Sequence, residues 1–460
     1  MNGDSYSSDD RDSDDDGIEY FRRRKDDSDD SFNKSFYSPV KKYDNDDLLD
    51  DSFSYQKGQE NYYGELNLAK LKSLREQLNW ENEEERYPFY FRLTDLLEIW
   101  TGDLPNLKDI FRREEIDWLL TEAAINRRKT VDNNRGRFFI EFVLSTGYRD
   151  EPELSEDGKP SLRRTTAVHR VEDTDRLHVI PHLLLQVYNR FDVNYTDEFG
   201  YTHFHAACKY GLDGIVKEFL ELGQDPNCIL PETGDSPLHL ALILGYSNMK
   251  TIQLLLRSGA DSNLANKEGS TPLHIICKRL QYLDNNLAKL FFEINDEKHQ
   301  TVQIDAKDGL GRTPLQLAVA SLLPDVVDVL LDRGADLSSF VFPAENYFGE
   351  IWERDKYDNS TTSHLFLVSS AMNVVERLEK RGYKLDRSDA LTIMKYFDKF
   401  EFFKKPVDLV EFLRDNKDFM FYNLIQLPPE ESWIKVKPRK HRLRHGLHCF
   451  TNSFICNKLR

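Results

Sequence analysis

The side chains best suited to bind a metal gather near the C-terminus of the chain. Three histidines and two cysteines fall within sixteen residues, at His441, His445, His448, Cys449 and Cys456. Imidazole and thiolate groups are the ligands that zinc prefers, in modules of defined order and spacing. The order and spacing of these five residues match no such module. The sequence therefore predicts no metal site, and nothing in it indicates a cofactor.

Three other histidines, His205, His239 and His274, recur at intervals of 34 and 35 residues. A metal or acid–base site needs several such groups in one cluster, whereas these stand one to a segment. The chain also lacks the phosphate-binding glycine signatures, the Gly-x-Ser-x-Gly elbow and the His-Glu-x-x-His pair. We therefore predict that the protein is not an enzyme.

Each of these histidines belongs to a repeated segment that begins with Thr or Ser. The segments begin at Thr166, Thr202, Ser236, Thr271 and Thr313, which are 36, 34, 35 and 42 residues apart. In the regular copies Pro, Leu and His follow, and a turn with Gly comes about twenty residues later. The first hydroxyl suits a helix N-cap and the proline suits the first helical position. The pattern predicts a stack of short helix pairs.

By this signature and period, residues 161–340 resemble the ankyrin-repeat family, whose period is about 33 residues. The resemblance implies an all-α solenoid of about five helix-turn-helix repeats with short β-fingers. It also implies that the histidines are structural and join neighbouring turns by hydrogen bonds. His203 replaces the proline of the second copy, and Gln316 replaces the histidine of the fifth. The interval after Thr271 is eight residues longer than the shortest one, and we expect the insertion to lengthen the second helix or the loop after it.

A stack of such repeats exposes its finger tips and first helices on a concave side, which we predict to bind a partner protein. The predicted finger positions are Glu198, Phe199, Tyr201, Glu232, Thr233, Asp235, Lys267, Glu268, Ser270, Leu310 and Arg312. The predicted helix positions are Lys209, Tyr210, Ile243, Leu244, Lys278, Arg279, Ala320 and Ser321. Aromatic and arginine side chains are favoured anchors, which selects Phe199, Tyr201, Tyr210 and Arg279. Replacing Tyr201 and Tyr210 with alanine is predicted to weaken binding and to leave thermal stability unchanged.

Charge and composition predict the remaining organisation of the 460 residues. The formal net charge is −18, and Met1 to Asp51 hold 17 acidic and 8 basic residues, a net charge of −9. So few apolar residues accompany this charge that we expect 1–57 to be a disordered acidic arm. We predict an N-terminal helical capping region at 58–160, the repeats at 161–340, and a degenerate repeat with C-terminal helices at 341–427. A basic, disordered tail is predicted at 428–460.

The same features limit the partners. The acidic balance disfavours nucleic acid, whose phosphates bind clustered lysine and arginine. No apolar stretch approaches the length of a membrane span, and five scattered cysteines are typical of a reduced, intracellular protein. We expect a monomer in the cytoplasm. The basic run at 435–444 leaves three explanations open, namely a nuclear import signal, a contact with the acidic arm, or a sequence from a shifted reading frame.

The segments on either side of the repeats resemble insect ankyrin proteins from parasitoid wasps. The similar segments are Ile110–Ile116, Phe342–Gly349, Val374–Tyr383 and Phe421–Leu427. Many members of that group end in a PRANC module, an F-box-like helical domain shared with poxvirus ankyrin proteins. The resemblance implies an alternative function, a substrate-recruiting adaptor that binds the adaptor subunit of a cullin-type ubiquitin ligase. Because the expected apolar helices do not follow Leu427, we expect this module to be truncated.

Overall fold

The structure is a computed structural model that describes residues 50–125, 135–171, 179–244, 248–278, 286–344, 347–348 and 361–399. Within these ranges it describes all side chains except those of 50–61, 244, 361–369, 394 and 396–399. The chain divides into two units, Met1–Gln59 and Glu60–Arg460, and the packing described below is that of the second unit. The arm before residue 50, the tail at 428–460 and the histidine–cysteine cluster near the C-terminus lie outside the described residues.

The described chain is helical. Before the repeats come α1 (Asp50–Glu76), α2 (Glu83–Glu98), η1 (Leu107–Asp109), α3 (Arg113–Ile125) and α4 (Arg135–Ser145). The five repeats contain, in pairs, η3 (Ala167–Arg170) and α5 (Val179–Val187), α6 (His203–Lys209) and α7 (Asp213–Glu221), α8 (Pro237–Leu244) and α9 (Met249–Arg257), α10 (Pro272–Cys277) and α11 (Leu287–Glu297), and α12 (Pro314–Ala320) and α13 (Pro324–Asp332). After them come α15 (Thr361–Lys380) and α16 (Arg387–Lys399).

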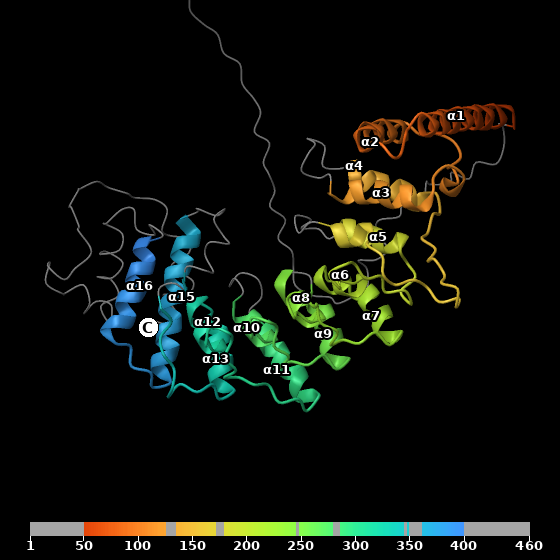
Figure 1. Ribbon diagram of the computed structural model, residues 1–460. Coiled ribbons are helices and arrows are strands. Elements are labelled where there is room, and N and C mark those ends of the chain that lie inside the picture. The colour runs from red at the N-terminus through yellow and green to blue at the C-terminus, as the bar shows by residue number, and fades with distance from the viewer. Residues whose placement is uncertain are drawn as a thin grey trace, which may run out of the picture. The chain divides into compact units, whose positions relative to one another are not determined.

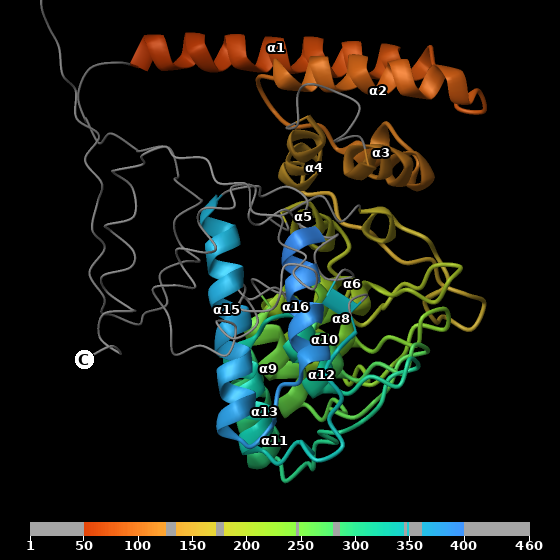
Figure 2. The same ribbon diagram turned by 90° about the vertical axis from the view of Figure 1, so that its left-hand side faces the viewer.

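The helix pairs are stacked in sequence order (Figure 1). The first helices contact one another in the order η3, α6, α8, α10 and α12, and we call these the inner helices. The second helices α7, α9, α11 and α13 contact one another in the same order. Figure 2 shows the segments that connect successive repeats, the fingers, projecting to one side of the helices. In the described residues the first finger contains isolated β-bridges, of Thr196 with Thr202 and with Arg163. The predicted all-α solenoid is confirmed.

The hydroxyl groups of Thr202, Ser236 and Thr313 cap their inner helices as predicted. In the third repeat the backbone N–H of Ser236 donates to Nδ1 of His239 at 3.2 Å. Because that nitrogen accepts, the proton of the neutral imidazole is on Nε2, which lies 3.0 Å from the carbonyl oxygen of Ser270 in the next finger. The other histidines make the same bridge, His169 to Tyr195, His205 to Cys228 and His274 to Arg312. The structural role implied for these histidines is confirmed.

Gln316 performs the same task in the fifth repeat, where the sequence has no histidine. Its Oε1 accepts from the N–H of Thr313 at 3.0 Å, and its Nε2 donates to the carbonyl oxygen of Val341 at 3.0 Å. An amide side chain offers one acceptor and one donor, as a neutral imidazole does. The departure from the repeat signature therefore preserves the bond between repeats.

The N-terminal helices continue the stack. Helix α3 contacts the inner helix η3, and α4 contacts α5, the second helix of the first repeat. Within the predicted capping region η1 ends at Asp109 and α3 begins at Arg113, so these are two separate helices. The side chain of Glu115, 3% exposed, accepts from the backbone N–H of Arg112 at 3.0 Å. This carboxylate caps α3 and fixes a separate start for the helix.

A buried charged network joins α3 to the first two repeats. Arg164 forms ion pairs with Asp117 of α3 and with Asp150, and its Nη1 lies 2.9 Å from Oδ1 of Asp150. The hydroxyl of Tyr188 donates to Asp117 at 2.8 Å, and that of Tyr195 donates to Asp150 at 2.7 Å. Burial raises the pKa of Asp117, while its contact with Arg164 opposes that rise. Every charge in the network has a partner, so the junction is specific as well as buried.

The segment after the repeats packs against the last of them. Helix α15 contacts α13, and Arg377 of α15 pairs with Asp325 and Asp328 of α13 at 2.9 and 3.1 Å. Val374, Val375 and Leu378 are buried. With 20 residues, α15 is longer than any helix of the five repeats. It therefore closes the stack as one long helix.

The insertion in the fourth repeat lies mainly between its two helices. Three residues separate α6 from α7 and α12 from α13, whereas nine separate α10 from α11. Helix α11 has eleven residues, two more than α7, α9 or α13. The predicted position in the second helix or the following loop is thus wrong for most of the extra residues. A connection between helices tolerates insertions because few packed contacts depend on it.

Candidate functional site

The finger tips expose the residues that stand four and three positions before each helix cap. The exposed side chains at these positions are those of Glu198, Phe199, Glu232, Thr233, Lys267, Glu268 and Leu310. A turn holds each tip open. In the second repeat Oδ1 of Asp197 accepts from the N–H groups of Phe199 at 2.9 Å and Tyr201 at 2.8 Å. Asn266 and Asp308 make the same pair of bonds in the fourth and fifth repeats.

The residue directly before each cap lies deeper than predicted. The side chains of Ser270 and Arg312 are 1% and 5% exposed, and the expectation that they are exposed is wrong. Arg312 pairs with the buried carboxylate of Asp308 at 2.8 Å. Tyr201 and Asp235 are half-buried, and Asp235 accepts from Nδ2 of Asn266 in the neighbouring finger at 2.8 Å. The bonds of the turn direct this residue back towards the helices, so it supports the finger.

The predicted helix positions divide in the same way. Tyr210 is 2% exposed and its hydroxyl donates to the carbonyl oxygen of Val171 at 3.1 Å, so its expected exposure is wrong. Ser321 is also buried and donates to the carbonyl oxygen of Cys277 at 2.7 Å. These residues end their helices and bond to the preceding repeat. Arg279 and the side chain of Leu244 lie outside what the structure describes.

One position earlier, the helix ends face solvent in three repeats. Ile243 is 50% exposed, Lys209 and Lys278 are half-buried, and Ala320 is buried. The ammonium group of Lys209 lies 5.6 Å from the ring centroid of Tyr210, and that of Lys278 lies 3.4 Å from Oγ of Ser270. These contacts hold both lysines along the inner helices.

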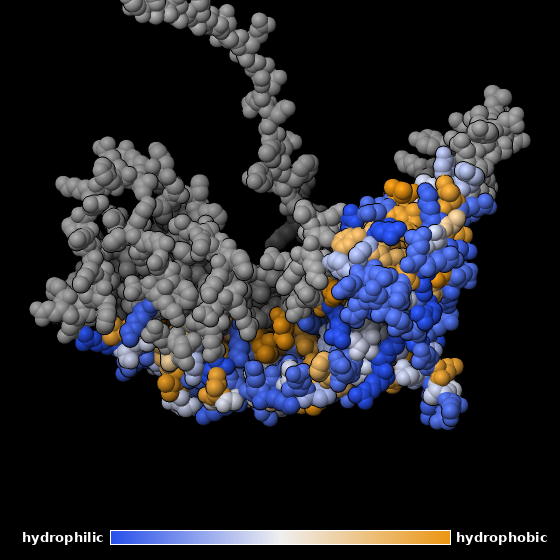
Figure 3. Space-filling view, turned by 45° about the horizontal axis from the view of Figure 1, so that its top comes forward, coloured by the Kyte–Doolittle hydropathy of each residue, from blue (hydrophilic) through white to orange (hydrophobic). Residues whose placement is uncertain are grey.

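The prediction missed several exposed apolar residues near the fingers. Ile229, Leu154, Leu162 and Val341 are between 47% and 66% exposed. Figure 3 shows orange, hydrophobic areas within a mostly blue, hydrophilic surface. In the sequence these residues are large apolar side chains in loops next to the fingers, at positions that the repeat signature does not mark as exposed. The fingers therefore carry more apolar surface than predicted.

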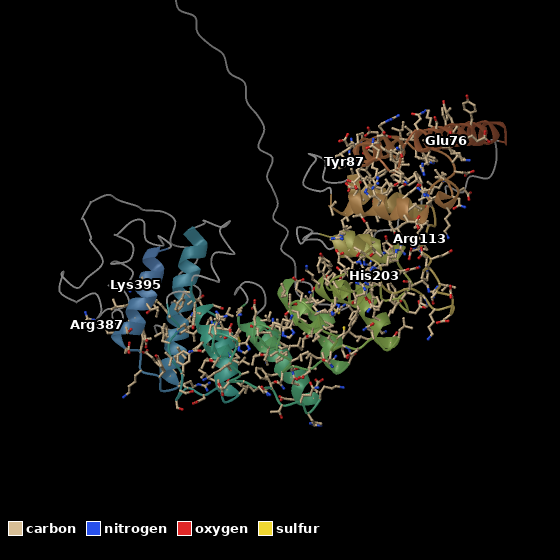
Figure 4. The ribbon with its side chains drawn as sticks, in the orientation of Figure 1. Glu76, Tyr87, Arg113, His203, Arg387 and Lys395 are labelled. Atoms are coloured by element: carbon tan, nitrogen blue, oxygen red, sulfur yellow. The ribbon has the colours of Figure 1, made fainter. Side chains whose placement is uncertain are left out.

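The cysteines described in the repeats and the histidines that bridge neighbouring repeats are buried or half-buried. Burial raises the pKa of the Cys228 thiol to about 12, which leaves it protonated and a poor nucleophile. His203, labelled in Figure 4, is 1% exposed, and its Nε2 lies 2.7 Å from Oγ1 of Thr166. Burial lowers the pKa of His203 well below its ordinary value, and His169 and Arg164 lower it further. In the part of the chain that the structure describes, no three His, Cys, Asp or Glu side chains are placed to hold a metal.

Known protein families account for the second to fifth repeats. Residues 185–249 match a family model of ankyrin repeats in many copies, and residues 244–340 match a model of three ankyrin repeats. This part of the chain therefore consists of ankyrin repeats. The two matches together leave unassigned most of the first repeat, which precedes residue 185, and the helices on either side of the repeats.

Curated relatives share segments of 84 to 147 residues with this chain. The chain is 40% identical over 84 residues to human (Homo sapiens) BCL-6 corepressor-like protein 1, covering 18% of this chain and 4% of the relative. It is 29% identical over 147 residues to Transient receptor potential cation channel subfamily A member 1 of Drosophila melanogaster, covering 30% and 12%. It is 34% identical over 144 residues to mouse (Mus musculus) Neurogenic locus notch homolog protein 1, covering 31% and 5%. The chain thus spans only a small part of these relatives.

These matches imply a role in protein–protein interaction. Ankyrin-repeat proteins are typically non-enzymatic scaffolds, and repeat arrays bind through extended surfaces. Among the described helices, none is both long and apolar enough to cross a membrane.

Proposed function

We propose that the chain is a non-enzymatic scaffold that binds a partner protein through its finger tips and the exposed ends of its inner helices, without a cofactor. The observation that carries this proposal is the exposure of large apolar side chains on that surface. Phe199, Ile243 and Leu310 are 56%, 50% and 66% exposed. Isolated exposed apolar residues are common, but a set that follows one surface marks an interaction site.

The expected energies are those of interface anchors. Covering a large exposed apolar side chain contributes about 1.5 kcal/mol or more, and a few such residues dominate most interfaces. The polar tips Glu198, Glu232, Lys267 and Glu268 would form the charged rim that fixes the register of the partner. Tyr201 and Asp235, which are half-buried, would contribute mainly by holding the fingers in place.

Affinity purification with the full chain as bait tests this proposal. Partners retained by the wild type should be lost with the triple variant Phe199→Ser, Ile243→Ser, Leu310→Ser, because about 1.5 kcal/mol per residue amounts to roughly a thousandfold in affinity. The matched control is Ile99→Ser, Leu104→Ser, Leu222→Ser, three side chains that are 66%, 44% and 59% exposed on other parts of the chain. Equal retention by all three proteins would refute the proposed surface.

A second candidate is a substrate-recruiting adaptor of a cullin-type ubiquitin ligase. It rests on the resemblance to wasp ankyrin proteins, and it takes some support from α15 and α16, two further helices that follow the repeats. Residues 400–427 of the resembling region lie outside the described residues. Capture of an F-box adaptor protein by the full chain, but not by a chain that ends at Asp418, would favour this candidate. No capture by the full chain would exclude it.

The remaining expectations are also proposals. A cytoplasmic location, with the basic tail as a possible import signal, is tested by imaging a fluorescent fusion with and without Lys→Ala and Arg→Ala changes at 435–444. A monomer is tested by light scattering, and the domain boundaries by limited proteolysis, which should cut before residue 58 and after residue 427.

A further inference from the structure

The inner helices present a regular pattern of charge and apolar surface. Lys209, Ile243 and Lys278 each stand four residues after the capping histidine of their repeat, so they occupy equivalent places on α6, α8 and α10. These three helices contact one another in that order. An exposed isoleucine therefore lies between two lysines of the neighbouring repeats. In the next repeat the equivalent residue is Ala320, which is buried, so the pattern ends there.

Helix stability accounts for only part of this pattern. A lysine near the C-terminal end of a helix interacts favourably with the helix dipole, which gives Lys209 and Lys278 a structural reason. It gives none for Ile243, which is 50% exposed at the same place. The residues one position after the histidines, Ala206, Leu240 and Ile275, are also apolar, but the first two are buried and Ile275 is half-buried. Ile243 is thus exposed in a setting where other apolar side chains are covered.

We propose that α6, α8 and α10 bind an extended acidic segment of the partner, with a large apolar side chain on Ile243 and a carboxylate on each of Lys209 and Lys278. This inference rests on the proposed function and specifies its partner. Packed helices lie about 8 to 10 Å apart, and a peptide in the polyproline II conformation advances about 3.1 Å per residue with about three residues per turn, so that every third side chain lies on the same face. One repeat therefore corresponds to about three residues of the bound segment. The bound segment therefore has an acidic residue, two residues of any type, a large apolar residue, two more residues of any type and a second acidic residue.

The charges of the fingers favour a peptide over a nucleic acid. A single strand would place phosphates all along the surface. The exposed carboxylates of Glu198, Glu232 and Glu268 outnumber the one exposed ammonium group of the finger tips, that of Lys267, and would repel these phosphates. A segment with only two carboxylates can place both on the helix side. The apolar contact at Ile243 also has no counterpart in a phosphate backbone. Specificity comes from attraction at the helices and repulsion at the tips.

The test uses immobilised nine-residue peptides of Gly and Ser in which positions 2, 5 and 8 are varied. The four probes carry Asp/Leu/Asp, Lys/Leu/Lys, Asp/Ser/Asp or Ser/Leu/Ser, and an oligothymidine of twelve nucleotides is the fifth. The full chain should bind Asp/Leu/Asp about tenfold more tightly than any other probe, because two surface ion pairs and one apolar contact distinguish it. Equal binding of Lys/Leu/Lys, or stronger binding of the oligonucleotide, would overturn the inference.

Charge reversal gives the sharper outcome. Lys209→Glu with Lys278→Glu should reverse the preference towards Lys/Leu/Lys, and Ile243→Ser should abolish the difference between Leu and Ser at position 5. The matched control is Lys217→Glu with Lys250→Glu, the same change of charge on the second helices α7 and α9, which should leave the preference unchanged. If the double glutamate variant unfolds at a lower temperature than the wild type, the variant Lys209→Gln with Lys278→Gln replaces it. This variant should lose the preference for Asp/Leu/Asp without gaining one for Lys/Leu/Lys. An unchanged preference in the folded variants contradicts the inference.

The outcomes separate this inference from the proposed function. If the acidic probes fail while a natural partner is still retained by the wild type and lost with the serine triple variant, the surface is right and the ligand class is wrong. If that variant also retains every partner, the proposed function itself fails.

Discussion

Replacement of His239 measures the strength of the bonds between repeats. The imidazole is fully buried, accepts from Ser236 N–H at 3.2 Å and donates to the Ser270 carbonyl oxygen at 3.0 Å. Alanine would remove both bonds and leave a cavity. A lost hydrogen bond with a buried unpaired group costs about 1 kcal/mol or more, and the cavity adds about 1 to 2 kcal/mol. We predict that His239→Ala lowers the free energy of unfolding by about 3 to 4 kcal/mol.

Glutamine provides the control, because Gln316 already makes the equivalent two bonds in the fifth repeat. His239→Gln should lower the free energy of unfolding by only about 1 kcal/mol, because the amide can keep both hydrogen bonds and loses at most the good geometry of one of them. Urea denaturation followed by far-ultraviolet circular dichroism gives the free energies, and amide hydrogen exchange should show the loss of protection in α8 and α10. If glutamine costs as much as alanine, ring packing and not hydrogen bonding is the source of the stability. If alanine costs less than about 1 kcal/mol, the bridge is unimportant.

Three further predictions concern stability. Burial lowers the pKa of His205 to about 4. In the unfolded chain a histidine has a pKa near 6.5. The stability that neutral His205 contributes is therefore complete above pH 6.5 and is lost as the pH falls towards 4. Acid denaturation curves should show that His205→Gln reduces this loss by up to about 3 kcal/mol. Tyr210→Ala should lower the free energy of unfolding by about 3 kcal/mol and Tyr210→Phe by about 1 kcal/mol, because Tyr210 is buried and not exposed as its sequence position predicted. An unchanged melting temperature for the alanine variant would contradict this burial. His299 has φ of 55°, where Gly223 and Gly259 end the equivalent helices, so His299→Gly should stabilise by about 1 kcal/mol, and a lower denaturation midpoint would argue against strain there.

The caps and the stacking of the repeats were predictable because they depend on residues close in sequence. Thr202 and His205 are three positions apart, and a hydroxyl at a helix N-terminus can cap regardless of what lies beyond it. The same local logic placed Phe199 and Leu310 at open turns. The sequence showed that Gln316 stands at the position of the histidine, but not that it makes the equivalent bonds.

The depth of individual side chains was not predictable in this way. Tyr210 and Lys209 are neighbours in sequence, yet only Tyr210 is buried, because its hydroxyl reaches Val171 of the preceding repeat. Arg312 has the type and position of an interface anchor but pairs with Asp308 inside the finger. Both outcomes depend on contacts between segments, which a periodic pattern does not specify. The position of the insertion between α10 and α11 was missed for a similar reason, since helix ends in that repeat lack a Gly signal.

Amide hydrogen exchange on the chain with its captured partner tests the central claim most directly. The account predicts slower exchange in the finger tips at 197–201, 230–235, 266–270 and 308–312 and at the ends of α6, α8 and α10, with little change in α7, α9, α11 and α13. Protection confined to those second helices, or to α1 and α2, would contradict the claim that fingers and inner helices form the binding surface.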